Sequence, residues 1–304
     1  MTKKLFETKY GYFAEDGAEY VITTPHTPKP WVNIICPGDY GLVISQEGCG
    51  YSWYQHATIN RLTYWQQDML KDQYGKFIYL FDLDTKKCWS PTYKPTCVKP
   101  KFYECHHGIG YTTIVSENFD IRTEITFFVP SGASAETWIL KLKNLGKGKR
   151  NIAVTSYVEW CLGLQHENRE FSKLFTRTSF EKNAVFATKT MWSLPNKKGQ
   201  HMNRSWEFYA FHTISEEISD FCLDRKEFYE NEFFQRNKQK NVLHQPGKVQ
   251  NGEEAVASLA SDITLMPGEE KEIVFTVGIS EKKEEAKKII GKCNQIANAK
   301  KLLQ

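Results

Sequence analysis

Hydrophobic residues recur at every second position in four separate segments of the chain, with polar residues such as Arg122, Glu124 and Lys141 between them. A period of two is typical of a β-strand that buries only one face. The apolar positions are Ile121, Ile125, Phe127 and Val129; Trp138, Leu140 and Leu142; Ile152, Val154, Val158 and Trp160; and Ile273, Phe275, Val277 and Ile279. The pattern therefore predicts four half-buried strands.

Turn-forming residues separate these segments. Pro130-Ser131-Gly132 and Asn144-Leu145-Gly146-Lys147-Gly148 lie between successive strands, and Met266-Pro267-Gly268-Glu269 precedes the last one. Short turns favour antiparallel hairpins. Many strands without regular helical interludes predict an all-β sandwich rather than a parallel α/β sheet.

Two segments depart from the strand pattern. Residues 215–236 are rich in Glu, Asp, Phe and Arg, and we interpret them as a loop with a short helix. Residues 281–303 are expected to form an amphipathic helix capped by Ser280. Its apolar stripe consists of Ala286, Ile289, Ile290, Cys293, Ile296 and Ala297. This helix either packs back on the sandwich or leads into something else.

Composition places the chain among ordinary globular proteins of one or two domains. It has 304 residues, of which 40% are hydrophobic and 25% charged, with a net charge of +4. So small a charge, dispersed along the chain, does not favour nucleic acid as a partner. No stretch approaches the about 20 apolar residues of a membrane span. The 8 cysteines show no C-x-x-C spacing, and no secretory signal opens the chain, so we expect a cytoplasmic protein with reduced thiols.

Two groups of residues invite a chemical interpretation. Glu104-Cys105-His106-His107 could suggest a metal, but neighbours on a strand point to opposite faces, so His106 and His107 should not converge on one ion. We therefore expect no metal site. Glu159 lies on the polar side of its strand, so an exposed or salt-bridged carboxylate is expected rather than a catalytic acid.

Tyr51-Ser52-Trp53-Tyr54 forms an aromatic cluster. Aromatic faces can stack on sugar rings, and the same residues can equally be core aromatics on a strand. The pattern leaves both interpretations open.

A longer series of short motifs makes the chain recognisable. In order they are Tyr10-Gly11-Tyr12-Phe13, Glu19-Tyr20-Val21-Ile22-Thr23, Pro30-Trp31-Val32-Asn33, Tyr40-Gly41-Leu42-Val43-Ile44-Ser45, Gly48-Cys49-Gly50-Tyr51-Ser52-Trp53-Tyr54, Arg61-Leu62-Thr63, Ile78-Tyr79-Leu80-Phe81-Asp82, Trp89-Ser90-Pro91-Thr92-Tyr93-Lys94-Pro95, Tyr157-Val158-Glu159-Trp160-Cys161-Leu162-Gly163, Asp224-Arg225-Lys226-Glu227-Phe228 and Leu265-Met266-Pro267-Gly268-Glu269. This series resembles the opening domain of the inverting β-glucoside phosphorylases of glycoside hydrolase family 94, which include cellobiose, cellodextrin and chitobiose phosphorylases. The related cyclic β-1,2-glucan synthases share it.

The resemblance implies a supersandwich of two large antiparallel sheets, similar to galactose mutarotase, over residues 1–280. Residues 281–304 would begin a helical linker to a catalytic (α/α)₆ barrel that these residues do not include. In the family's reaction one carboxylic acid protonates the leaving oxygen, and inorganic phosphate, a co-substrate, attacks the opposite face of the anomeric carbon. The catalytic Asp and most phosphate ligands lie in the barrel, so the resemblance assigns no catalytic residue and no other cofactor here.

The sandwich's own roles in the family are dimerisation and lending a loop to the partner subunit's active site. The resemblance places this loop at residues 165–173, where Phe171 matches the family's N-F-Q-R-like stretch. Ser172 and Lys173 replace its Gln and Arg, and Arg169 lies nearby. Lysine keeps the charge but lacks the planar fork of arginine.

The resemblance also places Tyr51, Trp53 and Arg61 near the barrel mouth. The implied ligand is a β-linked gluco-oligosaccharide, and the implied partner is a second copy of the chain or a separate barrel chain.

Two alternatives stay open. The chain could be a stand-alone carbohydrate-binding protein that uses Tyr51, Trp53 and Tyr54 as a platform. It could also be a self-sufficient mutarotase-like enzyme, which needs a histidine and a carboxylate on a concave sheet face; the histidines available on strands are His106, His107 and His212.

Overall fold

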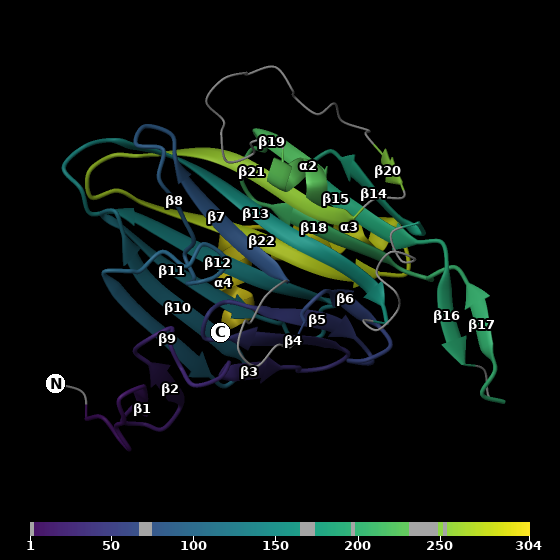
Figure 1. Ribbon diagram of the computed structural model, residues 1–304, viewed down its shortest axis with the longest axis horizontal. Helices are drawn as coiled ribbons and strands as arrows, with labels where there is room; N and C mark the ends of the chain where they lie inside the picture. Colours follow the sequence, from purple (N-terminus) through teal and green to yellow (C-terminus); the bar gives the residue numbers. More distant parts are fainter. Residues whose placement is uncertain (1–2, 67–74, 165–173, 196–197, 231–248, 252–253) are drawn as a thin grey trace.

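Two antiparallel β-sheets lie face to face and enclose most of the hydrophobic side chains (Figure 1). The computed structural model describes residues 3–66, 75–164, 174–195, 198–230, 249–251 and 254–304. Every strand pair among these residues is antiparallel, and the predicted all-β two-sheet sandwich is confirmed. A separate hairpin of β16 (Trp192–Pro195) and β17 (His201–Arg204) projects from one end of the sandwich.

The larger sheet has eleven strands and is called the large sheet below. Its strands, in spatial order, are β1 (Gly11–Phe13), β2 (Glu19–Ile22), β9 (Phe102–Gly108), β10 (Tyr111–Asn118), β11 (Ile121–Phe128), β12 (Ala135–Asn144), β22 (Glu270–Ser280), β18 (Tyr209–Ile214), β15 (Ala184–Lys189), β14 (Thr176–Glu181) and β20 (Val249–Asn251).

The second sheet has nine strands and is called the small sheet. Its main path runs through β19 (Asp220–Asp224), β21 (Ala255–Leu265), β13 (Arg150–Gly163), β6 (Arg61–Thr63), β5 (Gly50–Tyr54), β4 (Tyr40–Ser45) and β3 (Val32–Ile35). Two further strands lie off this path: β7 (Lys76–Asp82) pairs with β13, and β8 (Cys88–Trp89) pairs with β7.

The core between the sheets is built from the positions that the period-two pattern selected. All the apolar residues singled out on β11, β12, β13 and β22, together with Val129 just after β11, belong to one buried cluster. Full burial of one such side chain stabilises a fold by about 1.5–3 kcal/mol. The alternation therefore predicts the inward face of these four strands correctly.

A charged pair is buried between the two sheets. Lys76 on β7 of the small sheet contacts both carboxylate oxygens of Glu136 on β12 of the large sheet, and both side chains are 0% exposed. Ser52 Oγ accepts a hydrogen bond from Lys76 Nζ (2.6 Å) and donates one to Glu136 Oε2 (2.8 Å). Trp138 Nε1 donates to Glu136 Oε1 at 3.2 Å. Burial lowers the pKa of Lys76 to about 8, against the attraction of Glu136, so Lys76 is still mainly protonated at pH 7.

The C-terminal segment folds as two helices rather than one, α3 (Lys283–Cys293) and α4 (Ile296–Leu303). The predicted cap at Ser280 is wrong: Ser280 ends β22, and the N-cap of α3 is Lys282, which makes no side-chain cap hydrogen bond. Strand pairing takes precedence there because Ser280 pairs with Tyr209 across the sheet.

Both helices pack back on the outer face of the large sheet. This is the first of the two arrangements that the apolar stripe suggested. Ala286 and Ile290 bury against Phe186 and Phe211, and Ala299 buries against Phe128. Ala297, a member of the predicted stripe, is exposed because the chain changes direction between the helices.

Residues 215–236 contain a strand that the composition did not reveal. β19 pairs with β21 at the edge of the small sheet, and its Phe221, Cys222 and Leu223 are all buried. The run is only three residues long and is flanked by Asp220 and Asp224, which hid it among acidic residues. The expected short helix is present as α2 (Arg225–Glu230), and residues 231–236 lie outside the described part.

No helix among the described residues is long and apolar enough to cross a membrane. The eight cysteines all lie in the described part of the chain and form no disulfide with one another, and five of them are buried.

Candidate functional site

Tyr51 and Trp53 lie on β5, on the face of the small sheet that points away from the large sheet. Their rings are 5.4 Å apart, and Tyr51 stacks on Trp65 at 5.8 Å. Tyr51 is 6% exposed and Trp53 is 8% exposed, so both belong to a second buried cluster on this outer face. The rings are packed against protein and offer little surface to a ligand.

Arg61 completes this packing from β6. Its guanidinium lies 3.9 Å from the centroid of the Tyr51 ring, within the range of a cation–π interaction. Its Nε donates a hydrogen bond to the Ala57 carbonyl at 2.7 Å. Arg61 and Tyr51 thus brace one another, and the strand register brings Arg61 opposite Trp53.

Tyr54 does not share a platform with Tyr51 and Trp53. It lies on the inner side of β5, packs against the core between the sheets and contacts Phe208 edge-on at 5.6 Å. The platform of three rings expected for a stand-alone binding protein is therefore wrong in its geometry, because Trp53 and Tyr54 are adjacent on one strand and point to opposite faces. The other three candidate residues, Arg169, Phe171 and Lys173, lie outside the described residues.

Two of the recognised motifs meet on the same outer face. Arg225, from the D-R-x-x-F motif, places its Nε 3.8 Å from Glu159 Oε2 of the Y-V-E-W motif. The Nη1 atom of Arg225 lies 2.9 Å from Glu254 Oε2. The Tyr157 hydroxyl donates a hydrogen bond to Glu159 Oε2 at 3.2 Å. Burial alone would lower the pKa of Arg225, but the attraction of Glu159 and Glu254 outweighs it and the pKa is raised. Glu159 is thus salt-bridged, as expected, but buried rather than exposed.

The remaining residues of the D-R-x-x-F motif explain its spacing. Asp224 Oδ1 accepts a hydrogen bond from the Glu227 backbone at 2.8 Å, which caps the first turn of α2. Phe228, one turn later, is fully buried and packs on Tyr157 at 4.6 Å and Tyr79 at 5.6 Å. The motif therefore begins a short helix, anchors it by an ion pair and docks it by one aromatic ring.

The tyrosines beneath α2 are held in their neutral form. Burial raises the pKa of both Tyr79 and Tyr157 well above the usual value. A phenol in this state does not act as a general base at neutral pH. Glu159 is held between the guanidinium of Arg225 and the hydroxyl of Tyr157. The outer-face network joins helix α2 to strand β13 through an ion pair and an aromatic contact.

The mutarotase-like alternative needs a histidine next to a carboxylate, so the surroundings of the strand histidines test it. His212 is buried between Ser156 Oγ (2.7 Å) and the Thr276 carbonyl (3.2 Å), and burial lowers its pKa to about 3. His107 contacts Thr112 Oγ1 at 2.9 Å and the Trp31 carbonyl at 3.1 Å, and burial lowers its pKa to about 4. Among the residues that the structure describes, no carboxylate contacts either of these histidines.

His106 points to the other face of β9, as the strand alternation predicts. Its Nδ1 lies 2.9 Å from Glu19 Oε2, and its Nε2 lies 3.3 Å from Glu104 Oε2. The carboxylates sit at opposite ends of the ring, so they do not converge with it on one reacting atom or ion. Within the described residues no group of three or more His, Cys, Asp or Glu side chains could hold a metal ion.

The contribution of the Arg225–Glu159 ion pair to the free energy of unfolding can be measured. Replacing Arg225 by methionine leaves the buried Glu159 without its cation, and we expect the free energy of unfolding to fall by about 1–2 kcal/mol, less than for a fully buried pair because Arg225 is 30% exposed. Urea denaturation of R225M, E159Q and the double variant measures the coupling. Strictly additive effects of the two substitutions would contradict a direct interaction.

Comparison with known proteins places the chain in one family. The sequence matches the family described as "Glycosyl hydrolase 94, supersandwich domain" over residues 18–296. An N,N'-diacetylchitobiose phosphorylase of Vibrio proteolyticus is 28% identical over 89% of this chain and 33% of its own length. The cyclic β-(1,2)-glucan synthase NdvB of Rhizobium meliloti (strain 1021) is 25% identical over 94% of this chain and 10% of its own length.

The chain therefore spans about a third or less of these curated relatives. Among solved structures, a galactose mutarotase-like protein from Lactobacillus casei ATCC 334 aligns with 82% of this chain and 100% of its own, at 9% identity and a TM-score of 0.44.

Proposed function

The chain belongs to the supersandwich domain family of glycosyl hydrolase 94, and on that premise we propose that it is the sandwich part of an inverting β-glycoside phosphorylase, without a catalytic centre of its own. The observation that carries the proposal is the meeting of the two family motifs. They converge in an ion-paired and aromatic network in which Glu159 is paired with Arg225 rather than free to act as an acid.

In this proposal the chemistry is supplied by residues beyond this sandwich. Phosphorolysis with inversion needs one carboxylic acid near the leaving oxygen and a phosphate ion on the opposite face of the sugar. The substrate we propose is a β-linked gluco-oligosaccharide. A relative that carries the matching sandwich, the Vibrio proteolyticus protein, bears the name of a phosphorylase and extends well beyond it.

We assign Tyr51, Trp53 and Arg61 an indirect role at the sugar site. Their rings and guanidinium pack on one another and are nearly fully buried, so they support the shape of the surface instead of stacking on a sugar. Titration with β-linked gluco-oligosaccharides should then leave the tryptophan fluorescence of the isolated chain unchanged at millimolar sugar. A saturable shift that is lost in Trp53→Phe would instead support a stand-alone carbohydrate-binding protein.

The proposal also includes self-association of the chain, the role that this sandwich has in its family. Sedimentation equilibrium should then give a mass of twice the 35.3 kDa of one chain. A single-chain mass across the micromolar range would remove dimerisation from the proposal, and would leave the assignment of the sandwich to a phosphorylase unchanged.

A further inference from the structure

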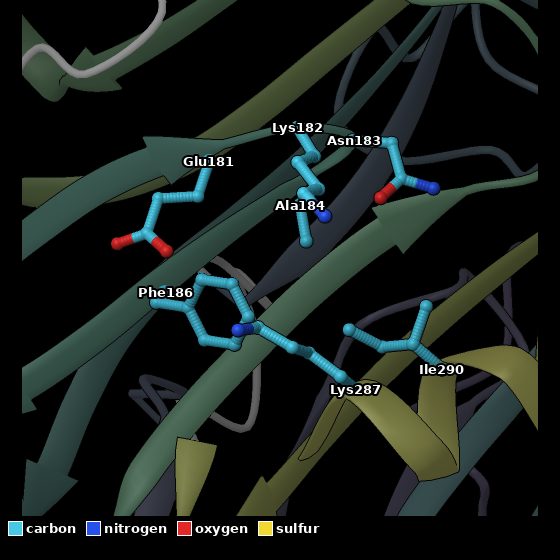
Figure 2. Close-up of a pocket in the computed structure, with 7 residues that line it drawn as sticks. All are labelled: Glu181, Lys182, Asn183, Ala184, Phe186, Lys287 and Ile290. Atoms are coloured by element: carbon cyan, nitrogen blue, oxygen red, sulfur yellow. The ribbon is translucent and has the colours of Figure 1, made fainter. Parts of the chain in front are cut away.

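A pocket of about 210 Å³ opens between the β14–β15 turn and helix α3, on the outer face of the large sheet (Figure 2). Its floor is apolar and consists of Ala184, Phe186 and Ile290. The α3 face that supplies Ile290 is packed on the sheet, so the two walls of the pocket are held in fixed positions. The pocket lies on the opposite side of the sandwich from Tyr51 and Trp53, which occupy the outer face of the small sheet.

The rim of the pocket is basic. Lys182 comes from the turn and Lys287 from α3, and Figure 2 shows Lys182 beside Ala184 and the end of Lys287 beside Phe186. Lys283 adds a third ammonium group, 4.7 Å from the centroid of the Phe186 ring.

Two carboxylates offset part of this positive charge. Glu181 is ion-paired with Lys283, and Glu284 lies 2.6 Å from Lys287. Three ammonium groups against two carboxylates leave one net positive charge. Lys182 has no ion-pair partner among the described residues, so the excess charge is centred on the turn.

Asn183 adds neutral hydrogen-bonding capacity beside Lys182. Its backbone carbonyl accepts a hydrogen bond from Thr213 Oγ1 at 2.8 Å, which fixes the turn. Its side-chain amide, shown as sticks in Figure 2, has no hydrogen-bond partner among the described residues. An amide carries both donors and an acceptor, which suits a sugar hydroxyl.

We propose that this pocket binds a phosphate monoester of a monosaccharide, with the phosphate between Lys182 and Lys287 and a hydroxyl on Asn183. Lysine binds phosphate as a point charge, and the pocket volume of about 210 Å³ leaves room for a sugar ring above the nearly buried floor. Phe186 is only 4% exposed, so ring stacking alone would hold a neutral sugar poorly, and the net charge favours the anion. The choice of a sugar phosphate rests on the proposed function, because inverting phosphorolysis of a β-glycoside gives an α-sugar 1-phosphate.

The test is calorimetric titration of the purified chain with α-glucose 1-phosphate. The double variant K182A/K287A should bind about tenfold more weakly or worse, because two charge-assisted contacts are lost. The matched control is K288A, which removes an exposed lysine of the same helix that does not line the pocket. Raising the salt to about 0.5 M should also weaken binding, since screening reduces attraction between exposed charges.

Three results would overturn the inference: equal affinity in K182A/K287A, equal affinity for glucose, or equal affinity for inorganic phosphate alone. Circular dichroism of each variant shows that it is folded. This experiment does not depend on catalysis, so absent binding would remove the pocket proposal and leave the sandwich assignment standing. Phosphate release by the chain alone would remove the non-catalytic role without deciding the pocket.

Discussion

Replacement of Lys76 by methionine is expected to lower the free energy of unfolding by about 3–5 kcal/mol, because it leaves Glu136 buried between the two sheets without its cation. Both side chains are 0% exposed. Ser52 and Trp138 donate hydrogen bonds to the carboxylate but supply no positive charge. Urea denaturation monitored by circular dichroism measures the loss.

The matched control is the double variant K76M/E136L, which removes both charges. Replacing a buried ion pair by apolar residues of similar volume is often neutral or stabilising, by about 1–4 kcal/mol. The double variant should therefore recover the stability that K76M loses. If the free energy of unfolding of K76M stayed within about 1 kcal/mol of that of the parent protein, the ion pair would not be a buried interaction that stabilises the two sheets against each other.

The second large effect is expected at Phe228. Truncation to alanine removes the ring that docks α2 on Tyr157 and Tyr79, and a buried Phe→Ala substitution costs about 3–5 kcal/mol. The same denaturation assay measures it. The matched control is Tyr229→Phe, because Tyr229 is 46% exposed and the contact of its hydroxyl with the Tyr79 hydroxyl is long, at 3.4 Å.

A loss below about 1 kcal/mol in F228A would mean that α2 opens without disturbing the sandwich. Hydrogen exchange would then show fast exchange confined to residues 225–230. The D-R-x-x-F motif would in that case be a local feature, and its role in joining the outer-face network would be wrong.

The alternating strands were predictable because each buries one face and shows the other to polar surroundings. On β11, for example, Ile125 is in the core while Glu124 is exposed. β4 and β7 are buried along their whole length, so they carry no such alternation. The short β19 also lacks alternation, because Phe221, Cys222 and Leu223 are all buried. Asp220 and Asp224 on either side further concealed this apolar run.

The candidate site was predictable only in part. Strand alternation already implies that Trp53 and Tyr54 face opposite ways. The pairing of Arg225 with Glu159 could not be deduced, because the two motifs are distant in the sequence and only the topology brings α2 onto β13. The pairing of Lys76 with Glu136 was equally hidden, since an isolated charged residue is expected at the surface.

The most direct test of the central claim is phosphate release by the purified, folded chain supplied with α-glucose 1-phosphate and a panel of sugar acceptors. We expect no release above background with any acceptor, because in our proposal the catalytic acid lies outside the sandwich. Clear, acceptor-dependent release that persists after repurification would contradict it and would place a complete active site within these 304 residues.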